Sequence, residues 1–360
     1  MDSMKLEDCC EILDSQRVPI TGSDRTSGDY PYYGANGIQD YVDDFIFDDE
    51  LVLLAEDGGN FGSKTRPIAY RVSGKCWINN HAHVLKPKAG LDVDYLCYSL
   101  MFYDVGGMVN GATRQKLTQT AMRQMIIPKR SIDEQIEIVN IIKKVQGVIA
   151  SRKEELEQLD LLIKARFVEM FGDPASNPMG WDETSVGNEC FYIKDGPHKS
   201  LPDIGKENGG HPFISVRNIV NGYIDFSSAR YISDEDYADA IKKCHPEKGD
   251  MLYSKGGTTG IAKLIDIDEE FANWVHVAVL KFDKTKLNGI FFENMLNGSY
   301  CYEQSQRLTK GIANRDLVLS AMEQIKMYRP PMKLQEQFAA FVTQVDKSKF
   351  EGRMIIIGYG

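Results

Sequence analysis

The chain carries one series of short segments twice, in the same order. The spacing that predicts this most clearly is Leu6-x-Asp8-x-Cys10, which returns as Val186-x-Asn188-x-Cys190. The other echoes are Pro31-Tyr32-Tyr33 with Pro212-Phe213-Ile214, Gly58-Gly59 with Gly256-Gly257, Val84-Leu85-Lys86 (after Trp77 and His83) with Val279-Leu280-Lys281 (after Trp274 and His276), Ala121-Met122 with Ala321-Met322, and Glu134-Gln135 with Glu336-Gln337. Six pairs in one order predict two copies of one fold. A length of 360 residues also suits two domains.

The first part of each repeat is rich in short runs that are typical of β-strands, separated by Gly, Pro and Asn. The runs are residues 45–54, 68–72 and 77–85 in the first repeat and 213–216, 251–253 and 274–282 in the second. Each repeat then continues into a helix. The pattern predicts an α+β fold: two tandem lobes with mixed sheets and helices, joined and spaced by long coiled-coil helices and related by a pseudo-two-fold repeat.

A heptad pattern predicts a helix from Asp133 to Phe171 that ends by Gly172. At 1.5 Å per residue it would span roughly 58 Å, which is too long for one small lobe to cover. We therefore expect a second helix beside it, beginning near Leu334. The seam residues, with Arg152 among them, are Ile138, Ile142, Val145, Ile149, Leu156, Leu159 and Ile163 in the first helix and Phe338, Phe341 and Val345 in the second.

These patterns divide the chain into six parts. We expect a first lobe at 1–130, a helical spacer at 131–172, a linker at 173–180, a second lobe at 181–330, a short second helix at 331–350 and an atypical tail at 351–360. The glycines of the tail oppose helix formation. A second helix that stops near Phe350 would leave Leu156, Leu159, Leu162 and Ile163 exposed, or covered by the tail, a second copy or a helical partner.

The charge of the chain is segregated, although its net value is −10. Eight acids and no base lie within 40–57, whereas 58–88 and 110–130 contain bases and no acid. Such runs can produce a positive surface on an acidic protein; ordinary solvated loops are the alternative. We take the following residues as candidates for contacts with DNA: Arg17, Lys64, Arg66, Arg114, Lys116, Lys194, Lys199, Arg217, Lys255, Lys263 and Arg315.

The sequence offers no convincing catalytic, cofactor or metal motif. The glycines after Gly58 miss the spacing of a phosphate-binding loop. His81 and His83 are predicted on one side of a strand, where packed or hydrogen-bonded histidines are the expected state. Asn177-Pro178 lacks the second proline and the aromatic residue of a methyltransferase turn. We therefore expect no enzyme activity, cofactor or metal.

The sequence also predicts a cytoplasmic protein. Its acidic start is unlike a signal peptide, and no run approaches the roughly 18 apolar residues of a membrane span. None of the seven cysteines forms a CxxC pair. We expect no contact with a membrane.

In its order of parts, the chain resembles the specificity subunits of type I restriction–modification systems. The segments that carry the resemblance are PYYGANG at 31–37, DGPH at 195–198, PFISVRNI at 212–219 and IDEQIEIVNIIKKV at 132–145. The resemblance implies two target-recognition domains, each reading one half of a split sequence in double-stranded DNA. It also implies helices that set the spacing and dock two methyltransferase subunits. Restriction subunits would join the full complex, whose adenine-N6 methyltransferase and endonuclease activities lie on these other subunits.

Three other hypotheses remain open at this stage. They are a coiled-coil interaction protein whose lobes do not bind DNA, a methyltransferase fused to its DNA-recognition domains, and an inactive truncated specificity subunit. The missing catalytic motifs count against the fused enzyme. The altered residues after Phe350 are the reason for considering a truncated variant.

Overall fold

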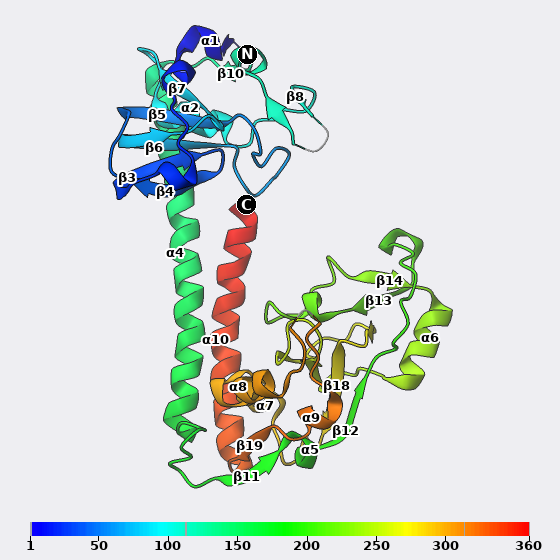
Figure 1. The fold of residues 1–360 in the computed structure, drawn as a ribbon. Helices are drawn as coiled ribbons and strands as arrows, with labels where there is room; N and C mark the ends of the chain where they lie inside the picture. Colours follow the sequence, from blue (N-terminus) through cyan, green and yellow to red (C-terminus); the bar gives the residue numbers. More distant parts are fainter. Residues whose placement is uncertain (1, 112–113, 313, 360) are drawn as a thin grey trace. The chain divides into compact units, whose positions relative to one another are not determined.

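The computed structural model of the protein describes residues 2–111, 114–312 and 314–359, with the side chains of the last helix described up to residue 349 (Figure 1). The chain divides into two compact units, Met1–Ala150 and Ser151–Gly360. The two units share the long helix α4 (Ile132–Phe171), which begins in the first and ends in the second.

A six-stranded sheet in the order β2-β7-β5-β6-β3-β4 forms the first lobe. Its strands β5, β6 and β7 are antiparallel neighbours, whereas β3 pairs with the end of β6 in parallel. The strands of the first unit are β1 (Ser3–Lys5), β2 (Cys10–Ile12), β3 (Ser27–Gly34), β4 (Gly37–Val42), β5 (Phe47–Ala55), β6 (Ala69–Ile78), β7 (Ala82–Pro87), β8 (Val109–Asn110), β9 (Lys116–Leu117) and β10 (Ile126–Pro128); its other helices are α1 (Leu6–Cys9), α2 (Val93–Leu100) and α3 (Gln119–Arg123).

Burial of apolar side chains holds this lobe together. Leu51, Val52, Leu53 and Leu54 of β5 are all fully buried, so both faces of this central strand are covered. One face packs against Leu96 of α2 and its neighbours. Asp92 caps α2 by accepting a hydrogen bond from the Tyr95 backbone at 2.9 Å, which explains why the helix begins there.

The second lobe repeats the strand order of the first in two smaller sheets. The four-stranded sheet β12-β18-β15-β16 corresponds to β2-β7-β5-β6, and β13 pairs in parallel with β17 as β3 pairs with β6. Its strands are β11 (Asp182–Ser185), β12 (Cys190–Asp195), β13 (His211–Ile214), β14 (Arg230–Ile232), β15 (Met251–Ser254), β16 (Ala262–Leu264), β17 (Ala272–Asn273), β18 (Val277–Phe282) and β19 (Lys326–Arg329). The single strand β6 is therefore replaced by two strands, which splits the sheet.

Further helices pack on the second lobe, on more than one of its sides. They are α5 (Val186–Glu189), α6 (Asp234–Lys243), α7 (Gly289–Asn297), α8 (Ser299–Leu308), α9 (Leu319–Met322) and α10 (Met332–Tyr359). The rings of Phe167 and Phe171 in α4 contact Phe291 in α7 and Phe338 in α10, with centroids 4.9–5.7 Å apart. This aromatic cluster joins the helices to the core of the second lobe.

Helix α10 runs antiparallel to the end of α4. Phe338 packs on Phe167, whereas Lys349 further along α10 pairs with Asp160, which lies earlier in α4 (2.6 Å). Helix α4 ends at Phe171 because Gly172 takes a positive φ of 77° and donates its backbone N–H to the Val168 carbonyl. The predicted long helix and its end are confirmed.

The structure corrects the predicted length of the second helix. Helix α10 continues to Tyr359 and is 28 residues long, so the tail after Phe350 is helical backbone despite its glycines. The expectation that the seam would be exposed or would need another cover is wrong for Ile163, which is buried, and for Leu159, which packs against the same core as the start of α10. Leu162 alone of the four is largely exposed, at 47%. Leu156 is half-buried.

Two strand predictions also change. Residues 77–85 are not one strand, because β6 ends at Ile78 and β7 begins at Ala82. His81 therefore lies in the turn between them and not beside His83 in a strand. In the second lobe β18 begins only at Val277, and Val216 lies in a 3-10 turn after β13.

The structure shifts the register of two predicted echoes. The backbone carbonyl of His81 accepts a hydrogen bond from the Glu56 backbone N–H at 2.9 Å. The carbonyl of His276 accepts one from the Lys255 backbone N–H at 2.8 Å, so His276 corresponds to His81 and not to His83. Likewise Gln335, and not Gln337, is the buried counterpart of Gln135. The repeat is real, but its alignment at these points follows the backbone and not the residue types.

Candidate nucleic-acid interface

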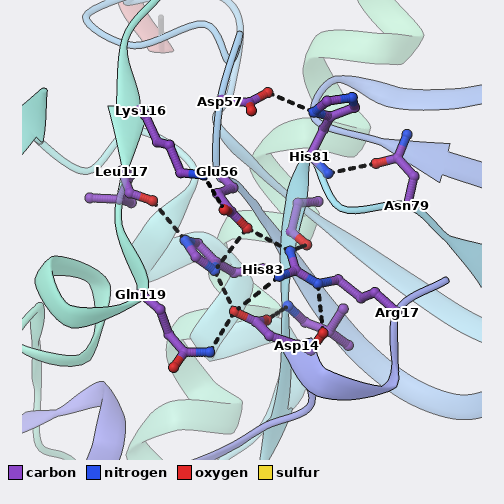
Figure 2. Close-up of polar contacts among 12 residues, drawn as sticks. Asp14, Arg17, Glu56, Asp57, Asn79, His81, His83, Lys116, Leu117 and Gln119 are labelled. Carbon is purple, nitrogen blue, oxygen red and sulfur yellow. Dashed lines mark hydrogen bonds and ion pairs between the residues drawn. The ribbon is translucent and has the colours of Figure 1, made fainter. Parts of the chain in front are cut away.

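A buried polar cluster lies at one end of the central strands of the first lobe (Figure 2). Asp14 follows β2, Glu56 follows β5 and His83 lies in β7, and these three strands are neighbours in the sheet. His83 is fully buried; its Nδ1 lies 2.7 Å from Asp14 Oδ2 and its Nε2 lies 2.9 Å from the Leu117 carbonyl. The cluster therefore joins the end of β2, β7 and strand β9.

Two basic side chains balance the carboxylates of this cluster. Arg17 Nη1 lies 2.6 Å from Glu56 Oε2, and Lys116 Nζ lies 2.9 Å from Glu56 Oε1 (Figure 2). Arg17 also lies 3.6 Å from Asp14. Ligand atoms of Asp14, Glu56 and His83 lie within 4.8 Å of one another, a spacing that a metal ion could use. The two cations already neutralise the two carboxylates, so the cluster fits an internal ion-pair network.

The network changes the acidity of its carboxyl groups. Burial by itself would raise the pKa of Asp14, but hydrogen bonds from His83, the Val84 backbone and Gln119 hold that pKa below its usual value. Burial likewise opposes the ionised form of Glu56, and the bonds from Arg17 and Lys116 outweigh it, so the pKa of Glu56 is also lowered. Both groups are therefore held as carboxylates at neutral pH.

The second lobe has a counterpart built from different residues. Asp195 ends β12 where Asp14 follows β2; it pairs with Lys243 at 2.8 Å and with Lys255 at 3.4 Å. Lys255 also pairs with Asp316 at 3.1 Å. Burial opposes ionisation of Asp195, but Lys243 and Lys255 hold its pKa below the usual value. The arrangement is again an internal network of charges.

The predicted cations of the first lobe fall into three groups. Lys64 and Arg66 are exposed, and no ion pair joins either to another residue of the described chain. Arg114 and Lys116 keep much of their side chains exposed while they pair with Asp57 and Glu56. Arg17 is largely covered, with 12% of its side chain exposed, and belongs to the network. Exposure and pairing thus favour Lys64 and Arg66 as groups that remain available to a ligand.

The second lobe sorts its candidates in the same way. Lys255 and Lys263 are buried, Lys263 between Asp266 (3.3 Å) and Glu293 (3.5 Å). The exposed candidates make weaker contacts: Lys194 lies over the Tyr192 ring, Lys199 faces Asp236 and Asp239, Arg217 donates to the Ser228 carbonyl, and Arg315 donates to Gln306. Sequence reasoning missed Glu293, Asp195 and Asp316 as partners because each lies 30 or more residues from its lysine along the chain.

The seam candidates also separate by position. In the second unit Leu159, Ile163, Phe338, Phe341 and Val345 belong to or pack against one core. Ile138 packs against the core of the first lobe. Ile142, Val145, Ile149 and Leu156 are half-buried. None of the helices in the described ranges is long and apolar enough to cross a membrane.

The fold and the two networks define a protein with two lobes of one design, each presenting loops held by internal charges. The family model of the type I restriction modification DNA specificity domain matches residues 1–161 and 188–354. The chain therefore belongs to this family, and it is the DNA specificity subunit of a type I restriction–modification system. Within such a complex it is a non-catalytic subunit.

Comparison with individual proteins agrees with this assignment. The chain is 28% identical over 354 residues to a putative type I restriction enzyme specificity subunit of Haemophilus influenzae, covering 95% of this chain and 86% of that one. It is 23% identical over 300 residues to the MjaIX specificity subunit of Methanocaldococcus jannaschii, covering 77% and 68%.

Solved structures share the fold. The crystal structure of the S subunit from M. genitalium matches with a TM-score of 0.59 at 14% identity, over 99% of this chain and 92% of that one. A chain from a study of complex assembly and conformational transition in the type I R-M system matches with a TM-score of 0.50 at 14% identity, over 99% and 96%. At such identities the likeness shows the fold alone.

Proposed function

We propose that each lobe reads one half of a bipartite target in double-stranded DNA. The observation that carries the proposal is that one strand order occurs twice in the chain with different loops and different charges on it. Two readers of one design with different surfaces suit a target with two unlike halves. The paired helices set the gap between the halves, because two half-sites lie on one face of the duplex only at certain separations.

The exposed cations supply contacts with phosphate in this proposal. Lys64, Arg66 and Arg114 serve in the first lobe, and Lys194, Lys199, Arg217 and Arg315 serve in the second. Phosphate contacts of this kind set position and affinity, whereas polar side chains at base edges carry the sequence information. Arg17, Lys255 and Lys263 are assigned instead to holding loops, since burial and internal carboxylates engage them. Lys116 is also assigned to holding loops, because its ammonium group pairs with Glu56.

Helix α4 carries an apolar surface that suits docking of other subunits. Leu161, Leu162 and Val168 are 47–54% exposed, although they lie on a helix whose other side packs in the core. We assign this surface to methyltransferase subunits, of which the full complex holds two. They carry the adenine-N6 methyltransferase activity, and restriction subunits add the endonuclease. Contiguous exposed apolar residues are typical of such interfaces.

The proposal keeps the predicted boundaries except at the second helical region. Residues 1–130 and 181–330 are the two target-recognition domains, 131–172 and 331–359 are the helical regions because α10 continues to Tyr359, and 173–180 is the linker. The seven cysteines are all free thiols and all buried. That state suits a reducing compartment, and we infer that the complex works in the cytoplasm.

Methylation mapping tests the proposal. The chain is co-expressed with its methyltransferase subunits in cells, and methylated adenines are located across the genome. We expect one bipartite motif with a constant gap. Replacing residues 181–330 by the matching part of the Haemophilus influenzae relative should change one half of the motif and keep the other half and the gap. A contiguous motif, or a change in both halves, would contradict the division of labour.

A further inference from the structure

In both lobes an ion pair joins the end of a central strand to the segment that returns beside it, and the two pairs have opposite polarity. In the first lobe Glu56, after β5, pairs with Lys116 at 2.9 Å. In the second lobe Lys255, after β15, pairs with Asp316 at 3.1 Å. The acid and the base have exchanged places.

Backbone geometry shows that these positions correspond. Leu117 donates its N–H to the Glu56 carbonyl at 2.7 Å, and Leu317 donates to the Lys255 carbonyl at 2.7 Å. Two residues further on, Gly58 donates its N–H to the Gln115 carbonyl (3.4 Å), and in the second lobe Gly257 donates to the Arg315 carbonyl (3.0 Å). The ion pairs therefore cross one and the same junction in the two lobes.

Burial is also the same on each side of the junction. The strand-end side chain is nearly covered, at 11% exposure for Glu56 and 7% for Lys255, whereas the partner is half-exposed, at 50% for Lys116 and 46% for Asp316. Each buried member has a second anchor of opposite charge, Arg17 for Glu56 and Asp195 for Lys255. The geometry is shared even though the sign of the charge is reversed.

The junction lies between loops that carry candidate DNA contacts. A glycine with positive φ follows each strand end, Gly58 at 62° and Gly257 at 69°. In the first lobe the chain then continues to Lys64 and Arg66, and on the other side of the junction Arg114 precedes Lys116. In the second lobe Arg315 precedes Asp316. A shift at the junction would move these cations relative to one another.

We propose that Glu56–Lys116 and Lys255–Asp316 are positioning pairs that hold the reading loops of each lobe in register for its own half-site. This inference rests on the proposed function, in which each lobe reads one half. Lys116 and Asp316 act through the loops they hold and not through their own charge toward DNA. Loss of either pair lowers discrimination by its own lobe only.

The reversed polarity provides the test. If these residues acted only through their own charges, the two variants would have opposite effects. Lys116→Met would remove an attractive charge and weaken DNA binding, whereas Asp316→Asn would remove a repulsive charge and strengthen it. Positioning pairs predict the same direction for both: poorer discrimination of the half-site read by that lobe. We expect a loss of roughly tenfold, the size of one base-pair mismatch.

The measurement uses the specificity subunit assembled with its methyltransferase subunits. Dissociation constants are determined for the matched duplex and for duplexes with one mismatch in either half. Lys116→Arg and Asp316→Glu, which keep the charges, should retain discrimination, and thermal unfolding midpoints should be similar within each set. Loss in the first half only for Lys116→Met, and in the second half only for Asp316→Asn, supports the proposal.

Three results would overturn it: effects of opposite sign in the two variants, equal loss in both halves, or unchanged discrimination. A failure of the proposed function looks different, because the unaltered complex itself would then show no separate dependence on the two halves.

Discussion

Gln335 makes in the second lobe the same three hydrogen bonds that Gln135 makes in the first. Gln135 accepts from the Asp92 backbone (2.8 Å) and donates to the carbonyls of Gly90 and Arg130. Gln335 accepts from the Asn288 backbone (2.8 Å) and donates to Lys286 and Pro330. Both side chains are fully buried. Each ties the start of a long helix to the N-terminal cap of a lobe helix, α2 or α7.

Gln335→Ala should therefore lower the free energy of unfolding of the second unit by about 2–4 kcal/mol, since it leaves buried backbone groups unpaired. Gln337→Ala is the matched control, because Gln337 lies on the same helix and is exposed. Chemical denaturation measures the unfolding free energies of the two variants, and hydrogen exchange of residues 286–290 measures the local loss of protection. Equal stability of the two variants would contradict the role given to Gln335.

Lys64→Ala combined with Arg66→Ala should weaken DNA binding and flatten its dependence on salt. Each phosphate contact contributes roughly one unit to the slope of log K against log salt concentration, so the slope should fall by about 1–2. The DNA-binding constant of the specificity subunit, assembled with its methyltransferase subunits, is measured at a series of salt concentrations. Lys153→Ala, an exposed change in α4, serves as the control. An unchanged slope would exclude both residues from contact with phosphate.

Acid should destabilise the first lobe through Asp14 and Glu56. Folding lowers the pKa of both carboxyl groups, so the unfolded chain binds more protons than the folded chain in acid. Their contribution to stability is complete above the usual values of 3.8 and 4.5 and is lost as pH falls through the lower folded values. Glu56→Gln should be less stable at pH 7 and less sensitive to pH in this range. Hydrogen exchange of β5 and β7, measured for both chains as pH falls, reports the stability of the lobe. If the two chains lost stability in parallel, Glu56 would not be a source of the acid sensitivity.

Leu162→Glu should weaken assembly with methyltransferase subunits without unfolding the chain. The side chain is largely exposed here, and burying a leucine at an interface is worth roughly 1.5–3 kcal/mol. Co-purification and titration of the subunits measure the loss, which we expect to exceed tenfold. Lys153→Glu, an exposed change more than two turns earlier on α4, is the control. If both variants assemble as the unaltered chain does, the docking surface lies elsewhere.

Periodic and repeated patterns were readable from the sequence because they are local. The heptad spacing from Ile138 to Ile163 predicted α4 almost to the residue, and the glycine after Phe171 predicted its end. The order of the echoes predicted two lobes of one topology. The same reasoning failed after Phe350, where three glycines opposed a helix that α10 nevertheless continues to Tyr359. Single-residue propensities are weak compared with continuation of an existing helix.

The sequence by itself thus determined the duplication, the long helix and the family. Only the tertiary structure decided which charges are free. Arg17 and Lys255 resembled any other surface base in the sequence, yet each is largely covered and pairs with a carboxylate, Glu56 for Arg17 and Asp195 for Lys255. It also decided that Gln335 matches Gln135. The physical reason is that ion pairs and buried hydrogen bonds join residues far apart along the chain, and their partners are set by strand order, which no local pattern records.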